Sequence, residues 1–227
     1  MKTDYAEVRR LLRLGLSGAL GSNSLAVPGH PFVSLLSYVL DEACRPVFLL
    51  SGLAEHTKNL LADPRASLLV AEAPGGGLEQ ARVTVLGTVA RVESDALWRA
   101  RFLRYSPESR DYLEWADFAF FRLEPVKARF IGGFGRMGWV DAVAAPSVLE
   151  PRIEAEVLEA LTPDLPPGAR VEGLDPEGLD LVVLGVRRRI VIHPEGGGRD
   201  ALLAAAREGI ARAGLGETTD PIGGNLA

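Results

Sequence analysis

Four polar side chains with the chemistry of a phosphate site lie close together in the chain: Ser51, His56, Thr57 and Lys58. A strand-like run precedes them and a helical pattern follows. Backbone N–H groups and the helix dipole at a helix start favour an anion, and Lys58 adds a full positive charge. This pattern therefore predicts a phosphate-binding site where a strand meets a helix. The alternative is a surface helix whose polar residues face water.

A strand, a short helix and a second strand would have to position these side chains. The run 45–51 is apolar and of strand length, and Gly52 interrupts it. The helical pattern that follows ends before Pro64, because a residue that precedes proline is disfavoured in the α region. A second buried strand is predicted at 66–70.

The rest of the chain alternates between amphipathic helices and short strands. Hydrophobic periodicity and capping patterns predict helices at 5–14, 95–105 (with Ser94 as N-cap), 108–115, 147–161 and 200–213. Strands are predicted at 19–27, 32–40, 81–93, 118–123, 127–132, 170–174, 179–184 and 187–192. This order indicates an α+β chain with a small barrel first and a helix–three strands–helix unit second.

Composition narrows the class of protein. The 227 residues, 47% of them hydrophobic and 24% charged, suit an ordinary soluble globular protein with one or two domains. A net charge of −5 argues against nucleic-acid binding. One cysteine and three histidines make a structural zinc site unexpected. No apolar run is long enough for a membrane span and the first ten residues lack a signal-peptide core, so we predict a cytoplasmic protein.

Three motifs carry a family resemblance. They are H-P-F-V-S-L-L-S-Y-V-L-D at 30–41, L-A-E-H-T-K-N-L at 53–60 and F-I-G-G-F-G-R at 130–136. In this order they resemble the FMN-binding split β-barrel superfamily, the pyridoxamine 5′-phosphate oxidase-like proteins. More narrowly, they are similar to its heme-utilisation branch, the HugZ-like proteins.

The resemblance implies a domain organisation and an assembly. We expect an α+β fold in which a split β-barrel at 1–140 precedes a small α+β domain at 147–214 and a mobile tail at 215–227. Split barrels of this superfamily generally dimerise and place two ligand sites in the subunit interface. The resemblance therefore implies a homodimer. Trp115 and Trp139 are expected in core or dimer contacts rather than stacked on a ligand.

The resemblance also assigns FMN-binding residues. They are Val33, Ser34, Ser37, Ser51, His56, Thr57, Lys58 and Arg82. The phosphate is expected at the helix start with Arg82 nearby, and the flavin along the strand that contains Ser34. That strand lacks the arginine and lysine of the oxidase motif R-x-V-L-L-K, which predicts weaker FMN binding. Pyridoxamine phosphate oxidation is not expected, because no set of cations for the substrate phosphate is evident.

Heme is the alternative ligand, because its iron takes histidine, cysteine, methionine or tyrosine. His193 follows the basic run 187–189, whose cations could face heme propionates, or could protect an edge strand by charge. The second domain departs from its relatives, because the segment 153–164 has no histidine where they carry a histidine-rich motif.

These residues and the resemblance lead to three functional hypotheses. The first is an FMN-binding oxidoreductase-like protein of the heme-utilisation type, in which flavin at a dimer interface performs hydride or electron transfer. The second is a heme- or tetrapyrrole-binding protein without flavin. The third is a cofactor-free dimeric scaffold. The sequence identifies no side chain that must act as an acid or a base.

Overall fold

The structure, a computed structural model, describes residues 5–72, 79–132, 136–141 and 149–214. The chain divides into two compact units, Met1–Ser147 and Val148–Ala227, and each is described here by itself. The domain boundaries expected from the sequence stay a prediction, and the expected mobile tail lies outside the described residues. None of the described helices combines the length and the apolar character that crossing a membrane would require.

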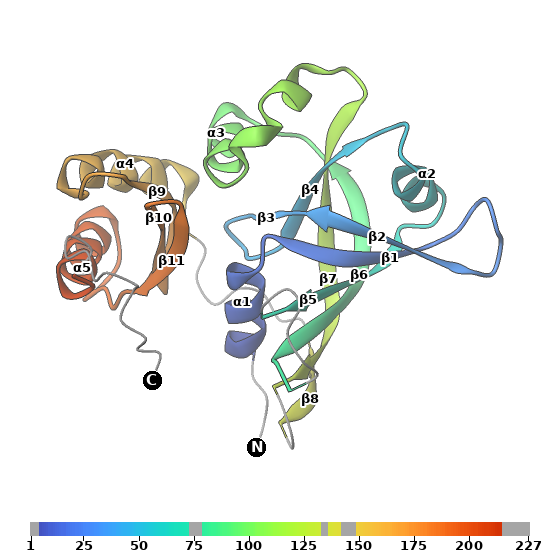
Figure 1. The fold of residues 1–227 in the computed structure, drawn as a ribbon, viewed down its shortest axis with the longest axis horizontal. Helices are drawn as coiled ribbons and strands as arrows, with labels where there is room; N and C mark the ends of the chain where they lie inside the picture. Colours follow the sequence, from blue (N-terminus) through green and yellow to red (C-terminus); the bar gives the residue numbers. More distant parts are fainter. Residues whose placement is uncertain (1–4, 73–78, 133–135, 142–148, 215–227) are drawn as a thin grey trace, which may run out of the picture. The chain divides into compact units, whose positions relative to one another are not determined.

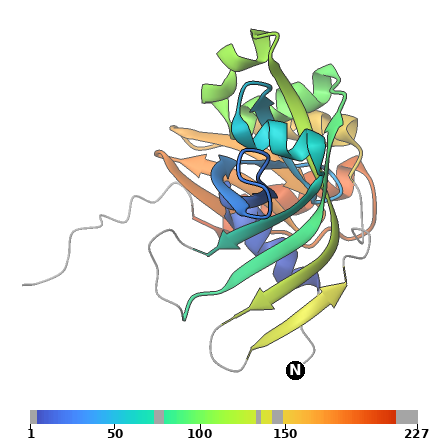
Figure 2. The same ribbon diagram turned by 90° about the vertical axis from the view of Figure 1, so that its right-hand side faces the viewer.

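The first unit is built on one antiparallel sheet that curls on itself (Figures 1 and 2). Its strands are β1 (Ser17–Asn23), β2 (Pro31–Ser37), β3 (Val39–Leu40), β4 (Pro46–Ser51), β5 (Arg65–Ala71), β6 (Arg82–Val92), β7 (Phe118–Ile131) and β8 (Met137–Asp141). The order is β2-β1-β5-β6-β7-β4-β3, and β8 pairs with β7. The curled antiparallel sheet confirms the predicted split β-barrel.

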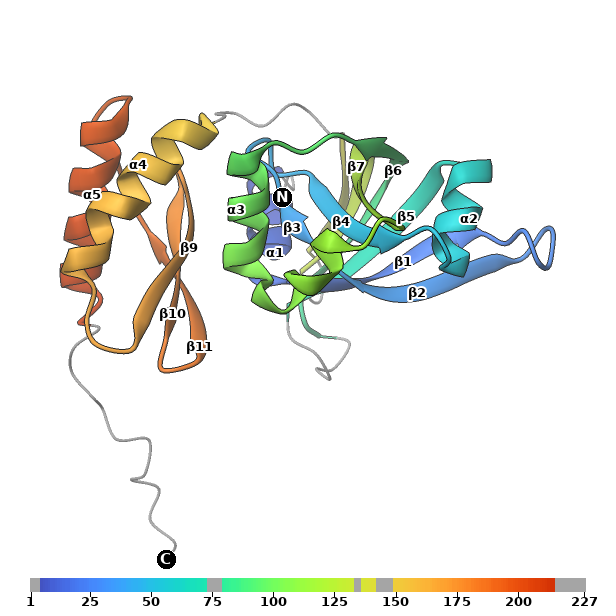
Figure 3. The ribbon, with the colours of Figure 1, turned by 90° about the horizontal axis from the view of Figure 1, so that it is seen from above.

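Two helices lie at opposite ends of the curled sheet (Figures 1 and 3). Helix α1 (Tyr5–Leu14), at the predicted position, points Val8, Leu11 and Leu12 into the barrel core, where all three are fully buried. Helix α2 (Glu55–Ala62) contributes Leu60 to the same core. The barrel interior is therefore filled by side chains.

Alternating side chains give the sheet an inner and an outer face. On β5, Leu68 and Val70 are fully buried in the core, whereas Leu69 between them is exposed. Strand β6 repeats this pattern with Val85 inward and Leu86 outward. This period of two is the pattern of a sheet with one buried face. Exposed leucines consequently lie on the outer face of the barrel.

A third helix covers a different part of the barrel. Helix α3 (Ala96–Tyr105) packs Phe102 against Phe120 of β7, with ring centroids 5.0 Å apart. Its N-cap is Asp95, one residue after the predicted Ser94, since the Asp95 carboxylate accepts from the Trp98 N–H at 2.7 Å. Phe102 and Phe120 belong to a separate small hydrophobic cluster under α3.

Several predicted elements differ in the structure. The strand predicted at 32–40 is two strands, β2 and β3. The helix predicted at 108–115 is two short 3₁₀ turns, Pro107–Ser109 and Asp111–Glu114. The strands predicted at 118–123 and 127–132 are one strand, β7, because Pro125 sits at a register shift opposite Gly87. A proline interrupts a strand pattern in sequence, but a bulge accommodates it without ending the strand.

The second unit is an α+β arrangement in which two helices cover one face of a three-stranded sheet (Figure 3). Its elements are α4 (Pro151–Leu161), β9 (Ala169–Asp175), β10 (Gly178–Val183), β11 (Val186–Val191) and α5 (Arg199–Arg212). The strand order is β11-β10-β9, all antiparallel. Helix α4 begins at Pro151, later than predicted, because proline favours the first turn of a helix.

Candidate functional site

The predicted phosphate site begins where β4 ends. The Ser51 hydroxyl donates to the Asp117 carboxylate at 2.6 Å and accepts from the Leu53 N–H at 3.1 Å. These contacts fix the turn that leads into α2. They also place a carboxylate beside Ser51, which disfavours an anionic ligand at this hydroxyl because like charges repel.

His56 and Ser34 meet below the start of α2. The His56 Nδ1 lies 3.2 Å from the Ser34 hydroxyl on β2. Burial lowers the pKa of His56 below its usual value of 6.5. The imidazole is therefore neutral near pH 7, so it can offer a ligand an N–H group but no positive charge.

The next three residues of α2 have different surroundings. Thr57 is buried, and its hydroxyl has no hydrogen-bond partner among the described residues. Lys58 is exposed and forms no ion pair with any residue that the structure describes. Asn59 is fully buried, donates to the Ser22 hydroxyl at 3.2 Å and accepts from the Leu25 N–H at 2.9 Å. Sequence reasoning missed Asn59, because its two partners lie on a distant hairpin.

Arg82 lies away from this cluster. The Val89 N–H donates to the Pro64 carbonyl, just after α2, at 2.7 Å. Arg82 comes seven residues earlier on β6, roughly 23 Å away along the strand. The expectation that Arg82 lies near the helix start is therefore not met within one chain.

Val33 and Ser37 are also separated from α2. They are exposed on the outer face of β2, whereas Ser34 faces the opposite way, toward His56. Side chains alternate between the two faces of a strand, so three neighbouring positions could not all face one ligand. The eight predicted residues thus form two groups: five near α2, and Val33, Ser37 and Arg82 on the outer face.

Two rows of paired residues cross six strands on this outer face. One row reads Leu35, Ala19, Leu69, Thr84, Arg129 and Trp139. The neighbouring row reads Val33, Gly21, Ser67, Leu86, Lys127 and Asp141. We call this surface the outer face. Its β2, β1 and β5 part is mainly apolar, whereas its β7 and β8 part is charged and aromatic.

The charged part surrounds one tryptophan. The Arg129 guanidinium lies 5.6 Å and the Lys127 ammonium 5.8 Å from the centroid of the Trp139 ring. Lys127 also pairs with Asp141 at 3.2 Å. Arg82, opposite Ile131 on β7, is the diagonal neighbour of Arg129, roughly 7–8 Å away. The outer face therefore concentrates positive charge at one side.

Neither tryptophan assigned to the core or a dimer contact is buried in this chain. Trp139 lies on the outer face and Trp115 follows the second 3₁₀ turn, and both are 54% exposed. A core position is therefore excluded for both, and a subunit contact stays a prediction.

Two of the three arginines in the basic run of the second unit form internal ion pairs. Arg187 pairs with the buried Glu172, and Arg189 pairs with Asp175 at 2.7 Å and Asp180 at 2.9 Å. Strand β11 is an edge strand. The pairs support the alternative in which these charges stabilise and protect this edge.

Comparisons with known proteins agree with this fold. The family model described as "CREG, beta-barrel" matches residues 2–144. A non-canonical heme oxygenase, HOZ, from Arabidopsis thaliana chloroplasts is 34% identical over 131 residues, 56% of this chain and 40% of HOZ. The chain thus spans about two-fifths of that relative's length.

Solved structures extend the likeness beyond the barrel. A heme binding protein from Mycobacterium smegmatis is 28% identical, with a TM-score of 0.55 over 94% of this chain and 98% of that one. A protein of unknown function from Agrobacterium tumefaciens has a TM-score of 0.67 over 91% of this chain and 94% of that one. It is 20% identical, so its likeness concerns the fold alone.

Proposed function

The chain belongs to the CREG β-barrel family, and from that premise we propose that it binds heme on the outer face of its barrel as a homodimer. The split-barrel family predicted from the sequence motifs is the one found. Two relatives carry heme in their names, a heme oxygenase and a heme binding protein. The observation that carries the proposal for this chain is the division of the outer face into apolar and cationic parts.

This division suits a flat ligand with acidic groups on one edge. Leu69 on β5 and Arg129 on β7 are separated by two strand spacings, roughly 10 Å. An apolar ring lying over the leucines would leave its carboxylates beside Arg129 and Arg82. Guanidinium groups form strong paired hydrogen bonds with carboxylates. Heme has a large apolar ring and two carboxylates, so the donor set fits it.

A methionine lies at the far edge of the outer face, on the side of the arginines away from the leucines. Met137 of β8 lies opposite Ile131, which in turn lies opposite Arg82. It is the one methionine on the outer face of the described strands, and no histidine, cysteine or tyrosine accompanies it there. Methionine sulfur is an established ligand of heme iron, but Met137 on β8 lies three strand spacings, roughly 14 Å, from Leu69 on β5, so Met137 of the same chain does not reach the iron of a ring that lies over the leucines. When bound, heme would supply redox chemistry at its iron, whereas this chain's residues bind and orient the ring.

A second copy of the chain would complete this site. Leu35 and Val33 are exposed on β2, and Leu69 and Leu86 continue the apolar surface across the sheet. Contiguous exposed apolar surface of this kind marks an interaction site. A partner placed over it would bury these side chains and exclude water from the ring, in keeping with the predicted homodimer.

The test is a heme titration followed by visible absorption. We expect a Soret band with the unaltered protein. The Arg82→Gln, Arg129→Gln double variant should bind heme about a hundredfold more weakly, because each lost charge-assisted hydrogen bond contributes roughly 1.5 kcal/mol. The matched control is Arg188→Gln, an exposed arginine on β11 that the structure leaves without an ion pair among the described residues.

The control decides which arginines matter. If the double variant binds heme with the same affinity as the unaltered protein, the outer face does not hold the heme carboxylates. A loss confined to Arg188→Gln would move the ligand to the second unit instead.

FMN is the second candidate ligand, and the start of α2 favours it. The exposed ammonium of Lys58 stands at a helix start whose cap, Ala54, provides no side-chain hydrogen bond. Neutral His56 and Ser34 add hydrogen-bonding groups nearby. A phosphate is the anion that such a helix start recognises. In this reading, bound flavin would supply hydride or electron transfer.

Comparing FMN with riboflavin tests this candidate, since the two differ only in the phosphate. We expect the fluorescence of FMN to be quenched when the protein binds it. The Lys58→Ala variant should bind FMN about tenfold more weakly, because it lacks one charge-assisted contact. Riboflavin affinity should be unchanged in that variant. If riboflavin and FMN bind the unaltered protein equally well, α2 holds no phosphate.

A further inference from the structure

A cluster of three aromatic rings lies in and just after the second 3₁₀ turn of the first unit. Tyr112 and Phe118 are stacked, with ring centroids 5.1 Å apart and an interplanar angle of 9°. Trp115 meets both rings nearly at right angles, with its centroid 5.3 Å from that of Tyr112 and 5.8 Å from that of Phe118. Tyr112 is 41% and Trp115 54% exposed. Neither of the ligand sites proposed above uses these rings.

Carboxylates accompany these rings along the chain. The segment 108–117 carries four of them, Glu108, Asp111, Glu114 and Asp117, against one guanidinium, that of Arg110. All five side chains are exposed, and neither Asp111 nor Glu114 forms an ion pair with a described residue. The name acidic–aromatic surface is used below for Asp111, Tyr112, Glu114, Trp115, Asp117 and Phe118.

Hydrogen bonds anchor this surface to the barrel. The Asp117 carboxylate accepts from the Ser51 hydroxyl at 2.6 Å, and the Asp117 carbonyl accepts from the Gly52 N–H at 2.7 Å. Phe118 begins β7 and pairs with Ser51 of β4. The Phe118 N–H also donates to the Trp115 carbonyl at 3.1 Å. The turn is therefore fixed before a partner arrives, which lowers the entropy lost on binding.

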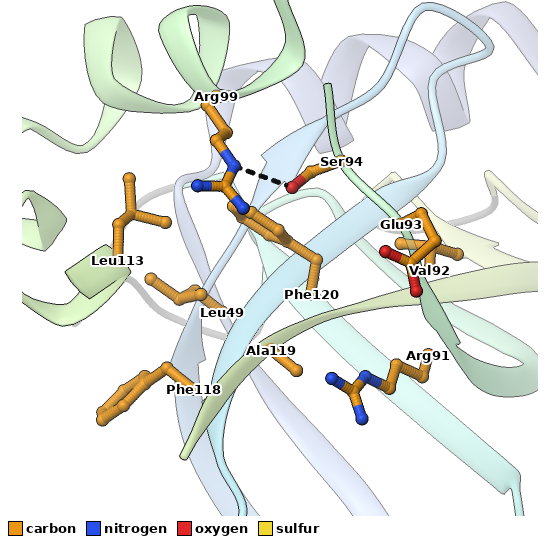
Figure 4. Close-up of a pocket in the computed structure, with 10 residues that line it drawn as sticks. All are labelled: Leu49, Arg91, Val92, Glu93, Ser94, Arg99, Leu113, Phe118, Ala119 and Phe120. Atoms are coloured by element: carbon orange, nitrogen blue, oxygen red, sulfur yellow. Dashed lines mark hydrogen bonds between the residues drawn. The ribbon is translucent and has the colours of Figure 1, made fainter. Parts of the chain in front are cut away.

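One further cation lies near this surface. Leu113 and Phe118 line one side of a small pocket beneath α3, and Arg99 of α3 points toward the same pocket (Figure 4). The Arg99 guanidinium donates to the Ser94 hydroxyl at 3.0 Å. It forms no ion pair with a carboxylate of the acidic–aromatic surface, all of whose residues the structure describes. The charge of these carboxylates thus remains available to a partner.

We propose that the acidic–aromatic surface binds an arginine-containing segment of a partner protein. Exposed tryptophan and tyrosine side chains are typical of protein interfaces and of the residues that contribute most to binding. The negative charge of the segment selects a basic partner and disfavours nucleic acids and anionic membranes.

The combination of rings and carboxylates favours arginine over lysine. A guanidinium is planar, so it stacks on an aromatic ring, and its forked N–H groups match a carboxylate. Trp115 offers the ring, since more than half of its surface is exposed, and Glu114 and Asp111 offer carboxylates in the turn before it. A lysine ammonium is a compact, strongly hydrated charge that cannot stack in this way.

A capped peptide of alternating arginine and glycine is the probe for the full-length chain. We expect it to bind and to shift the NMR signal of the Trp115 indole N–H. The chain has three tryptophans, and the signal of Trp115 is the one that disappears in Trp115→Phe. A peptide with lysine in place of arginine has the same charge and should bind at least about threefold more weakly, because it loses the stacking contact.

Variants separate this surface from a general attraction between opposite charges. Trp115→Ala should weaken binding of the arginine peptide about fivefold, since it removes the exposed ring. The double variant Asp111→Asn, Glu114→Gln should weaken it about tenfold. The matched control is Glu159→Gln, Glu195→Gln, which removes two exposed carboxylates from the second unit and should leave the affinity unchanged.

The carboxylate variant remains decisive if Trp115→Ala disturbs the turn, because it keeps all three rings. Its two side chains are exposed, so the fold is expected to persist, and unchanged amide spectra elsewhere in the chain would verify this.

Three results would overturn the proposal. Equal binding of the arginine and lysine peptides, or an equal loss in the control double variant, would reduce the interaction to unspecific charge. An unshifted Trp115 indole signal in the presence of bound arginine peptide would place the peptide elsewhere. A weaker dimer in Trp115→Ala, measured by sedimentation velocity, would assign the surface to a second copy of this chain. None of these results depends on heme or FMN binding, so this proposal and the proposed function fail independently.

Discussion

Replacing Leu35 by glutamate should convert the proposed homodimer into monomers. Leu35 is 78% exposed in one chain and lies in the apolar part of the outer face. In a two-fold dimer each subunit contributes one substituted residue, so the interface contains two new carboxylates. Burying a carboxylate without a partner costs several kcal/mol, so the dimer dissociation constant should rise at least about a thousandfold. Sedimentation velocity over a concentration series would measure the change.

The matched control is Leu53→Glu. Leu53 is 76% exposed and lies in the turn between β4 and α2, off the outer face. It should leave both the dimer and the melting temperature unchanged. A Leu35→Glu protein that dimerises with the original affinity would show that the outer face is not the subunit interface. Because Leu35 is exposed, a folded monomer is the expected product, and circular dichroism would verify it.

Local sequence patterns predicted the elements of this fold well. The apolar run 66–70 predicted a buried strand, although it gave no sign that Leu69 faces outward, and the spacing of Val8 and Leu12 predicted a helix face. These patterns depend on neighbours in the chain, so they can be recognised without knowing the topology. The split-barrel assignment came from the motif resemblance, and the family match confirms it.

The arrangement of the candidate sites was harder to predict, because it depends on strand pairing. Arg82 was expected beside Lys58, but the pairing of Arg82 with Ala71 and Ile131 places it at the other end of β6. Register is set by contacts between distant segments and leaves little trace in a single strand. The same reason explains why the contact between Ser51 and Asp117, 66 residues apart, was not foreseen.

Two other differences concern segments that contain a proline. Pro125 predicted a break between two strands, yet β7 continues through it, since Gly87 opposite allows β6 and β7 to approach closely. Pro107 and the polar residues after it resembled a helix start, but the segment forms only 3₁₀ turns. Tertiary packing decided both cases, and a window of local sequence could not include it.

Replacing Gly87 by alanine should destabilise the barrel by about 3 kcal/mol or more, which follows from the overpacking range and the severity of this contact. A methyl group at Gly87 would lie 2.1 Å from the Glu124 carbonyl oxygen and 3.0 Å from the Leu123 side chain. The first of these atoms belongs to the backbone of β7, so relief requires the paired strands to separate. We expect the melting temperature of the barrel to fall by roughly 10 °C.

Gly52→Ala provides the matched control for this prediction. A methyl group at Gly52 would lie 3.4 Å from the Asp117 carbonyl oxygen, which is ordinary contact, so its effect should be below about 1 kcal/mol. Urea unfolding, monitored through hydrogen exchange of the β6 and β7 amides, would compare the two variants. These amides report on the barrel rather than on the second unit. Equal stabilities of the Gly87 and Gly52 variants would mean that β6 and β7 can separate here at little cost. A loss confined to Gly87→Ala would instead identify this crossing as the point where the long central strands of the barrel must pack without a side chain.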